Sequence, residues 1–109
     1  MAKTNCSIYQ RAIRIFGEDE QLRMAQEECA ELIQAVNKYH RAIKYGSEKD
    51  QLAALESVVE ETADVEIMCE QIRIITGASS GINAVKADKT KRLEKKIEKK
   101  EKINKNGIK

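Results

Sequence analysis

The sequence predicts an all-α protein built on an antiparallel helical hairpin. Proline is absent from the 109 residues, and the composition is rich in the residues that favour helices. Apolar residues recur at alternating steps of three and four over two long stretches, which is the spacing of one helical face. Gly17, Gly46 and Gly77 each follow an apolar-periodic stretch, where a helix commonly ends in a left-handed residue.

Four helices are predicted, at residues 5–16, 19–45, 48–76 and 82–102. The apolar stripe of the second consists of Leu22, Ala25, Cys29, Leu32, Val36, Tyr39 and Ile43. The stripe of the third consists of Leu55, Val58, Thr62, Val65, Cys69 and Ile72. Ser47 and Asp50 have the spacing of a capping box before the third helix. Two long helices joined by a short loop predict an antiparallel helical hairpin. We expect a homodimer, in which a second copy completes a four-helix-bundle core.

Composition excludes several classes of protein. No apolar run approaches the roughly 20 residues of a membrane span. The first residues lack the apolar segment of a secretory signal. Three cysteines without a CxxC pair fit neither a disulfide framework nor a thiolate zinc site. We therefore expect a cytoplasmic protein with no membrane partner.

Charge is distributed unevenly along the chain. Residues 1–88 carry 10 Lys and Arg against 15 Asp and Glu, whereas residues 89–109 carry 10 Lys and Arg against three Glu. We predict a domain at 1–93 followed by a basic extension at 94–109. The whole chain has four aromatic residues and none lies in the basic run, so nucleic acid is not an expected partner.

Two carboxylate pairs stand out in the middle helices. Glu28 and Glu31 are three residues apart in one helix, and Glu61 and Asp64 are three apart in the next. Each pair therefore lies on one helical face, and each borders the apolar stripe of its helix. In an antiparallel hairpin the two rows can face each other, so four carboxylates would converge at half-buried positions.

Four like charges so close cannot all stay ionised without help. Either some pKa values rise or a cation neutralises the group. Oxygen-only ligands select a hard divalent ion, most simply Mg²⁺, with Mn²⁺ as a substitute. A ferritin-like di-iron site would need Glu-x-x-His, and the single histidine, His40, follows Asn37 at that spacing. The structural alternative is that these glutamates belong to ordinary solvated helix surfaces.

The pattern Glu27-Glu28-x-x-Glu31 followed by Glu61-x-x-Asp64 resembles the EExxE…ExxD signature of the MazG-like, all-α nucleoside triphosphate pyrophosphohydrolases. The flanking text QLRMAQEECAELIQAVNKYHR and LESVVEETADVEIMCEQI resembles that family too, and the resemblance covers about residues 8–93. The 29 residues between Glu31 and Glu61 are at or beyond the long end of the family's spacing.

The resemblance implies a reaction in which a nucleoside triphosphate and water give a nucleoside monophosphate and pyrophosphate, with Mg²⁺ required. It implies dimers or dimers of dimers. The implied Mg²⁺ ligands are Glu28, Glu31, Glu61 and Asp64. The implied phosphate-binding residues are Lys86, Lys89 and Arg92, in the helix after ExxD.

Several assignments stay open on the sequence alone. Glu27 and Glu60 are alternatives for the base that accepts a proton from water, or for contacts outside the metal ligands. One alternative function is a phosphoribosyl-ATP pyrophosphohydrolase, which shares the carboxylate layout. Another is a non-enzymatic helical interaction module whose basic tail binds an acidic partner. Base and sugar preference are not determined by any motif.

Overall fold

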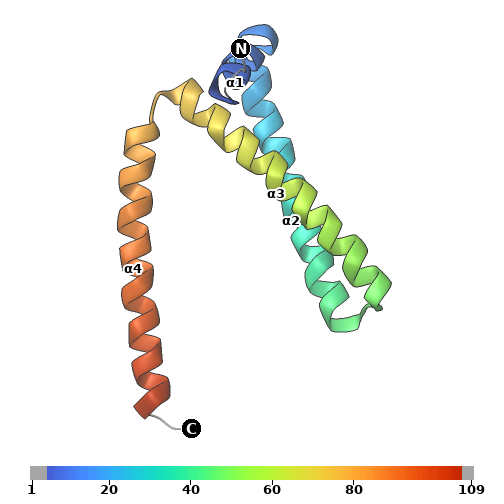
Figure 1. Ribbon diagram of the computed structural model, residues 1–109, viewed down its shortest axis with the longest axis vertical. Coiled ribbons are helices and arrows are strands. Elements are labelled where there is room, and N and C mark those ends of the chain that lie inside the picture. The colour runs from blue at the N-terminus through green and yellow to red at the C-terminus, as the bar shows by residue number, and fades with distance from the viewer. Residues whose placement is uncertain (1–4, 107–109) are drawn as a thin grey trace. The chain divides into compact units, whose positions relative to one another are not determined.

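The structure, a computed structural model, describes residues 5–106 and confirms the all-α prediction for this part of the chain (Figure 1). The described residues contain no strand and form the helices α1 Asn5–Phe16, α2 Glu18–Tyr45, α3 Glu48–Thr76 and α4 Ser79–Asn106. The first three helices agree with their predicted bounds to within one residue. No helix in the described part combines the length and apolarity that spanning a membrane requires.

The turn between α2 and α3 is held by local contacts. The Ser47 hydroxyl accepts the Asp50 N–H and the Asp50 carboxylate accepts the Ser47 N–H, both at 3.1 Å, which confirms the predicted capping box. Gly46 is extended, with φ −92°, so the prediction of a left-handed residue there is wrong. A side chain at position 46 would start 2.8 Å from the Ala42 carbonyl oxygen, so close packing is what requires glycine at this position.

The connection between α3 and α4 is shorter than predicted. Gly77 ends α3 in the expected left-handed conformation, with φ 64°. The predicted start of the last helix near Ile82 is wrong, because the Ile82 N–H donates to the Ala78 carbonyl at 2.9 Å and extends the helix back to Ser79. The helix also continues past Lys102 to Asn106.

The chain divides into two compact units after Gly77. The first unit contains α1, α2 and α3, and the second contains α4. The basic helix α4 runs without interruption through residues 93 and 94, where the predicted domain boundary lies. From Asn83 to Asn106 every residue of α4 is exposed.

The hairpin of α2 and α3 forms the body of the first unit. The two helices run antiparallel and only Gly46 and Ser47 connect them (Figure 1). Helix α1 packs against both, at the end of the hairpin opposite this turn (Figure 1). The hairpin thus has the predicted topology, with the carboxylate pairs near the middle of each helix.

The interface between α2 and α3 is centred to one side of the predicted apolar stripes. Ala25 is buried as expected, but six stripe residues are exposed: Leu22, Cys29, Val36, Ile43, Leu55 and Cys69. The buried positions of the hairpin are Gln21, Ala25, Ala35, Met68 and Gln71. The hairpin interface therefore combines two alanines with a methionine and two glutamines, and the six exposed apolar side chains lie beside it. Cys29 and Cys69, both members of the predicted stripes, are therefore not core residues.

The apolar core is small. Among the described residues the buried hydrophobic side chains are Ala25, Ala35 and Met68, which are 4–6% exposed. Two alanines and a methionine bury too little apolar surface to offset the conformational entropy lost when so long a hairpin becomes ordered. The exposed apolar side chains next to the interface lie outside this core.

Candidate metal centre

The centre of the hairpin brings acidic side chains together. Glu28 on α2 and Glu61 on α3 are both half-buried, and Glu31, one helical turn from Glu28, is exposed. One carboxylate oxygen from each of these three residues lies within 4.8 Å of the other two. We call these three residues the acidic cluster. The predicted convergence of the Glu28–Glu31 pair with Glu61 is present in the structure.

The size of the acidic cluster suits a small divalent cation. Octahedral Mg²⁺ holds its oxygen ligands at about 2.1 Å, which places neighbouring ligands about 3–4 Å from one another. Oxygens that already lie within 4.8 Å of one another need only small side-chain rotations to reach that spacing. The donor set consists of carboxylate oxygens only, which are the ligands that Mg²⁺ and Mn²⁺ prefer.

Two oxygens of the cluster lack partners. Glu28 Oε1 and Glu61 Oε1 are buried from solvent and accept no hydrogen bond. A buried acceptor without a partner is unfavourable, and it is more so when the group carries a charge. Ion pairs of the described residues lie away from the cluster, as between Arg23 and Asp19, Arg73 and Glu70, and Arg92 and Asp88. The two orphaned oxygens are therefore available to a ligand from solution.

Burial and mutual repulsion alter the acidity of the cluster. Burial, the side-chain contact with Glu31 and repulsion from the carboxyl groups of Asp64, Glu31 and Glu61 together raise the pKa of Glu28 from its ordinary value of 4.5 to about 7. Burial also raises the pKa of Glu61, with added repulsion from Glu31 and Asp64. A proton thus takes the place that a cation would otherwise fill near neutral pH.

The other predicted acidic residues lie around the cluster. Asp64 is half-buried and close enough for its charge to raise the pKa of both Glu28 and Glu61, but it is not among the three converging residues. Glu27 and Glu60 are exposed and also stand outside the group. The structure therefore brings together three of the four predicted ligands, with the fourth alongside them.

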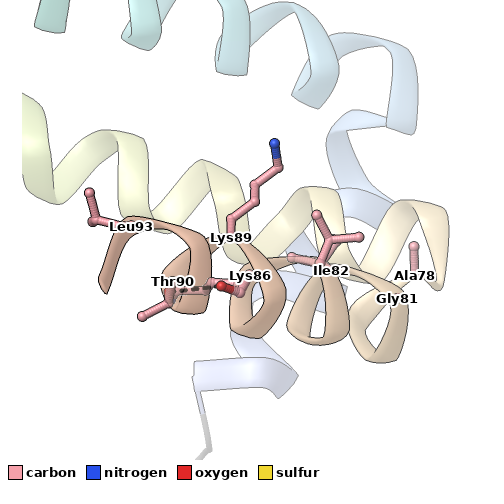
Figure 2. Close-up of a pocket in the computed structure, with 8 residues that line it drawn as sticks. Ala78, Gly81, Ile82, Lys86, Lys89, Thr90 and Leu93 are labelled. Carbon is pink, nitrogen blue, oxygen red and sulfur yellow. Dashed lines mark hydrogen bonds between the residues drawn. The ribbon is translucent and has the colours of Figure 1, made fainter. Parts of the chain in front are cut away.

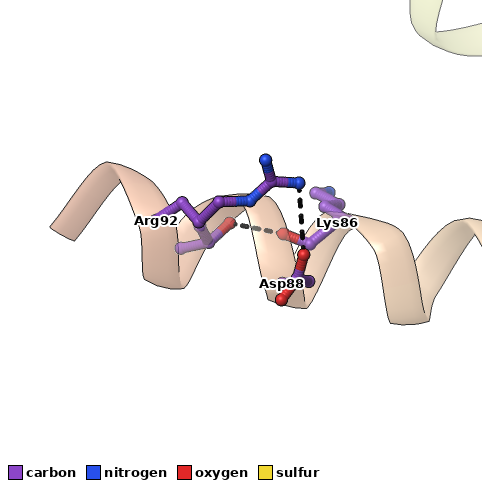
Figure 3. A network of polar contacts seen from close by, with 4 residues as sticks. Lys86, Asp88 and Arg92 are labelled. Carbon is purple, nitrogen blue, oxygen red and sulfur yellow. Dashed lines mark hydrogen bonds and ion pairs between the residues drawn. The ribbon is translucent and has the colours of Figure 1, made fainter. Parts of the chain in front are cut away.

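The predicted phosphate-binding residues all lie on α4. Lys86 and Lys89 line a groove along this helix together with apolar side chains including Ile82 and Leu93 (Figure 2). Arg92 is exposed, and its Nη2 donates to Asp88 Oδ2 at 3.2 Å within the same helix (Figure 3). A phosphate that bound Arg92 would compete with this exposed ion pair, which is a weak interaction in water.

The hairpin contains a buried polar contact that the sequence reasoning missed. Gln21 Nε2 donates to Gln71 Oε1 at 2.7 Å, and both side chains are at least 93% buried. Gln21 lies seven residues before Glu28 on α2, and Gln71 lies seven residues after Asp64 on α3. Because residues seven apart share a helical face, the two glutamines lie on the same faces as these acidic residues. In the sequence, this seven-residue spacing could have indicated that the two glutamines face each other. The hydrogen bond ties α2 to α3 and so helps to hold Glu28 opposite Glu61.

We expect the metal-free protein to lose stability as pH rises. The pKa of Glu28 is higher in the folded protein than in the unfolded chain, so its proton stabilises the fold at low pH, and this contribution disappears as pH rises from about 4.5 through about 7. The melting temperature should therefore fall between about pH 5 and 8 in EDTA. Saturating Mg²⁺ should remove the decline, because the ion replaces the proton.

The matched control for this pH dependence is Glu28→Gln, whose side chain cannot ionise. Its melting temperature should decline less than that of the wild type over the same range, at equal protein concentration. Parallel pH profiles for the two proteins would contradict the assignment of the raised pKa to the Glu28 carboxyl.

Comparisons of the chain with known protein families, with curated proteins and with solved structures found no match. The resemblance to MazG-like pyrophosphohydrolases therefore stays a prediction that depends on the motif residues themselves.

Proposed function

We propose that the chain is a Mg²⁺-dependent hydrolase that converts a nucleoside triphosphate to a nucleoside monophosphate and pyrophosphate. The observation that carries the proposal is the acidic cluster, in which Glu28 Oε1 and Glu61 Oε1 are buried without partners. Both residues belong to the EExxE and ExxD motifs on which the resemblance depends. A cluster on a merely solvated surface would have its oxygens in contact with water.

Each carboxylate has a proposed role toward the ion. Glu28, Glu31 and Glu61 would hold it directly, and Asp64 would complete the ligand set from its position beside them. Mn²⁺ should substitute for Mg²⁺, because it accepts the same oxygen ligands. When bound, the ion neutralises the cluster so that a polyanionic substrate can approach, polarises a phosphate oxygen and makes water more acidic.

The reaction requires water to be added across one phosphoanhydride bond. The hydroxyl goes to one phosphorus of the α,β-linkage and the bridging oxygen stays with the other, so the products are the monophosphate and pyrophosphate and one proton is released. Glu27 and Glu60 are exposed, and each directly precedes a cluster residue in the sequence. We propose one or the other as the acceptor of that proton. Lys86, Lys89 and Arg92 on α4 are proposed as phosphate contacts from the resemblance alone.

We further propose that the protein is a homodimer. The exposed apolar residues beside the hairpin interface lie on the side of α2 and α3 opposite Glu31 and Asp64, as their helical spacing requires. This apolar flank consists of Leu22, Cys29, Val36, Ile43, Leu55 and Cys69. Packing the apolar flanks of two copies together would bury these side chains, complete a four-helix bundle and leave both acidic clusters facing outward.

The activity is tested by measuring pyrophosphate release from a panel of canonical and modified nucleoside triphosphates, with Mg²⁺ and with EDTA. We expect Mg²⁺-dependent release of pyrophosphate together with a monophosphate. Glu61→Gln and Asp64→Asn should each reduce kcat/KM by about a hundredfold or more, because each removes a charge that the ion needs. Their circular dichroism spectra should remain helical.

The matched control is Glu56→Gln, an exposed residue of the same helix outside the cluster, which should keep full activity. Full activity in both Glu61→Gln and Asp64→Asn would contradict the proposed site. Hydrolysis of phosphoribosyl-ATP alone would favour the related histidine-pathway activity. No hydrolysis of any substrate by a folded protein would favour an interaction module.

The dimer is tested with Val36→Glu, which places a charge in the apolar flank. We expect wild-type protein to sediment as a dimer or a larger even-numbered assembly, and the variant to shift to monomer and melt at lower temperature, because burying an unpaired charge is unfavourable. Gln34→Glu, an exposed position on the opposite side of α2, should keep the assembly. A wild-type protein that stays monomeric at micromolar concentration would overturn the proposed interface.

A further inference from the structure

A groove runs along the hairpin between the acidic cluster and the turn. Its volume is about 480 Å³, and its lining includes Lys38, Arg41 and Tyr45 from α2 and Ala53, Ala54 and Ser57 from α3. No motif in the sequence marks these residues. The groove is distinct from the grooves along α4, which contain other lysines.

Small side chains create this groove. Ala42, Ala53, Ala54 and Ser57 line it, and the buried Ala35 lies between it and the cluster on α2. Where two packed helices present alanine and serine to each other, the depression between them is not filled by side chains. The resulting floor is backbone and methyl groups, and the long side chains of α2 form one rim.

The groove continues directly from the acidic cluster. Lys38 lies seven residues after Glu31 on α2, and Ser57 lies four before Glu61 on α3, so each shares a helical face with its cluster residue. Along the helix axis these offsets are about 10 Å and about 6 Å.

The charge of the groove is opposite to that of the cluster. Lys38 and Arg41 are exposed, and neither is paired with a carboxylate among the described residues. Asp50 also lines the groove, but its Oδ2 already accepts the Ser47 N–H at 3.1 Å in the capping box. Two cations without a carboxylate partner among the described residues therefore lie on the same side of the hairpin as the acidic cluster.

We propose that this groove is a subsite for the terminal phosphates of a metal-bound polyphosphate, with Lys38 and Arg41 as its anchors. The ion in the acidic cluster would hold one phosphate of the chain, and the remaining phosphates would extend over the alanine floor. Arg41 can bind a phosphate through two parallel N–H donors, and Lys38 adds a point charge nearer the cluster. The inference deepens the proposed function, on which it rests, by making Lys38 and Arg41 the residues that select a triphosphate over shorter phosphates.

The test measures polyphosphate binding as well as hydrolysis. Inorganic tripolyphosphate and orthophosphate are titrated calorimetrically into the Mg²⁺-loaded protein at fixed free Mg²⁺. We expect wild type to bind tripolyphosphate at least about tenfold more tightly than orthophosphate, because charge-assisted contacts are each strong enough to have that effect. Lys38→Gln with Arg41→Gln should abolish the difference and raise KM for the triphosphate about tenfold or more.

Two comparisons isolate the groove from other effects. Lys44→Gln removes a charge from the same helix at an exposed position outside the groove, and should leave binding and KM unchanged. Mn²⁺ affinity, followed by electron paramagnetic resonance, should be the same in the double variant and wild type, which shows that the acidic cluster is intact.

The outcomes separate this inference from the proposed function. Hydrolysis with unchanged KM and unchanged tripolyphosphate binding in the double variant overturns the groove and leaves the function standing. Tripolyphosphate binding that depends on Lys38 and Arg41, in a protein that hydrolyses no nucleotide, supports the groove and overturns the function. An equal loss in Lys44→Gln would show a general charge effect and overturn the groove assignment.

Discussion

The hairpin holds two half-buried glutamates, Glu28 and Glu61, where a pair of helices ordinarily places leucines. Neither Oε1 atom has a hydrogen-bond partner, and the pKa of each carboxyl group is raised. Such an arrangement is unfavourable unless a proton or a cation occupies it. The packing of α2 against α3 brings these carboxyl groups together, so the packing of the fold and the chemistry of the site depend on the same pair of helices.

The two sides of the hairpin carry different kinds of side chain. One side presents the acidic cluster and, beyond it, the alanine-floored groove with Lys38 and Arg41. The other presents the apolar flank, which includes Leu22, Val36 and Leu55. A second copy on the apolar flank would supply the core that a single chain lacks, while the polar side stays open to a nucleotide. The basic helix α4 adds further cations, of which Arg92 is already paired within its own helix.

Much of this arrangement follows from residue spacing. The absence of proline, the capping box at Ser47 and the two i, i+3 carboxylate pairs predicted the hairpin and the convergence of Glu28, Glu31 and Glu61. Which apolar side chains face the neighbouring helix could not be predicted, because a periodic stripe does not distinguish a partner in the same chain from one in another. Of the predicted stripes, Ala25 is buried and residues such as Leu32 and Val65 are half-buried, whereas Leu22, Val36 and Leu55 are exposed. The Gln21–Gln71 contact and the groove were missed because glutamine, alanine and lysine at these positions form no recognisable motif.

We propose that the half-buried Glu28 and Glu61 form a divalent cation site together with Glu31. A crystal of the protein grown with Mn²⁺ would reveal the ion through its anomalous scattering. We expect one strong anomalous peak about 2.2 Å from carboxylate oxygens of Glu28, Glu31 and Glu61, with the oxygens drawn closer together than 4.8 Å. If no peak is found there at saturating Mn²⁺ and Glu28 and Glu61 instead share a proton, these residues are not a cation site.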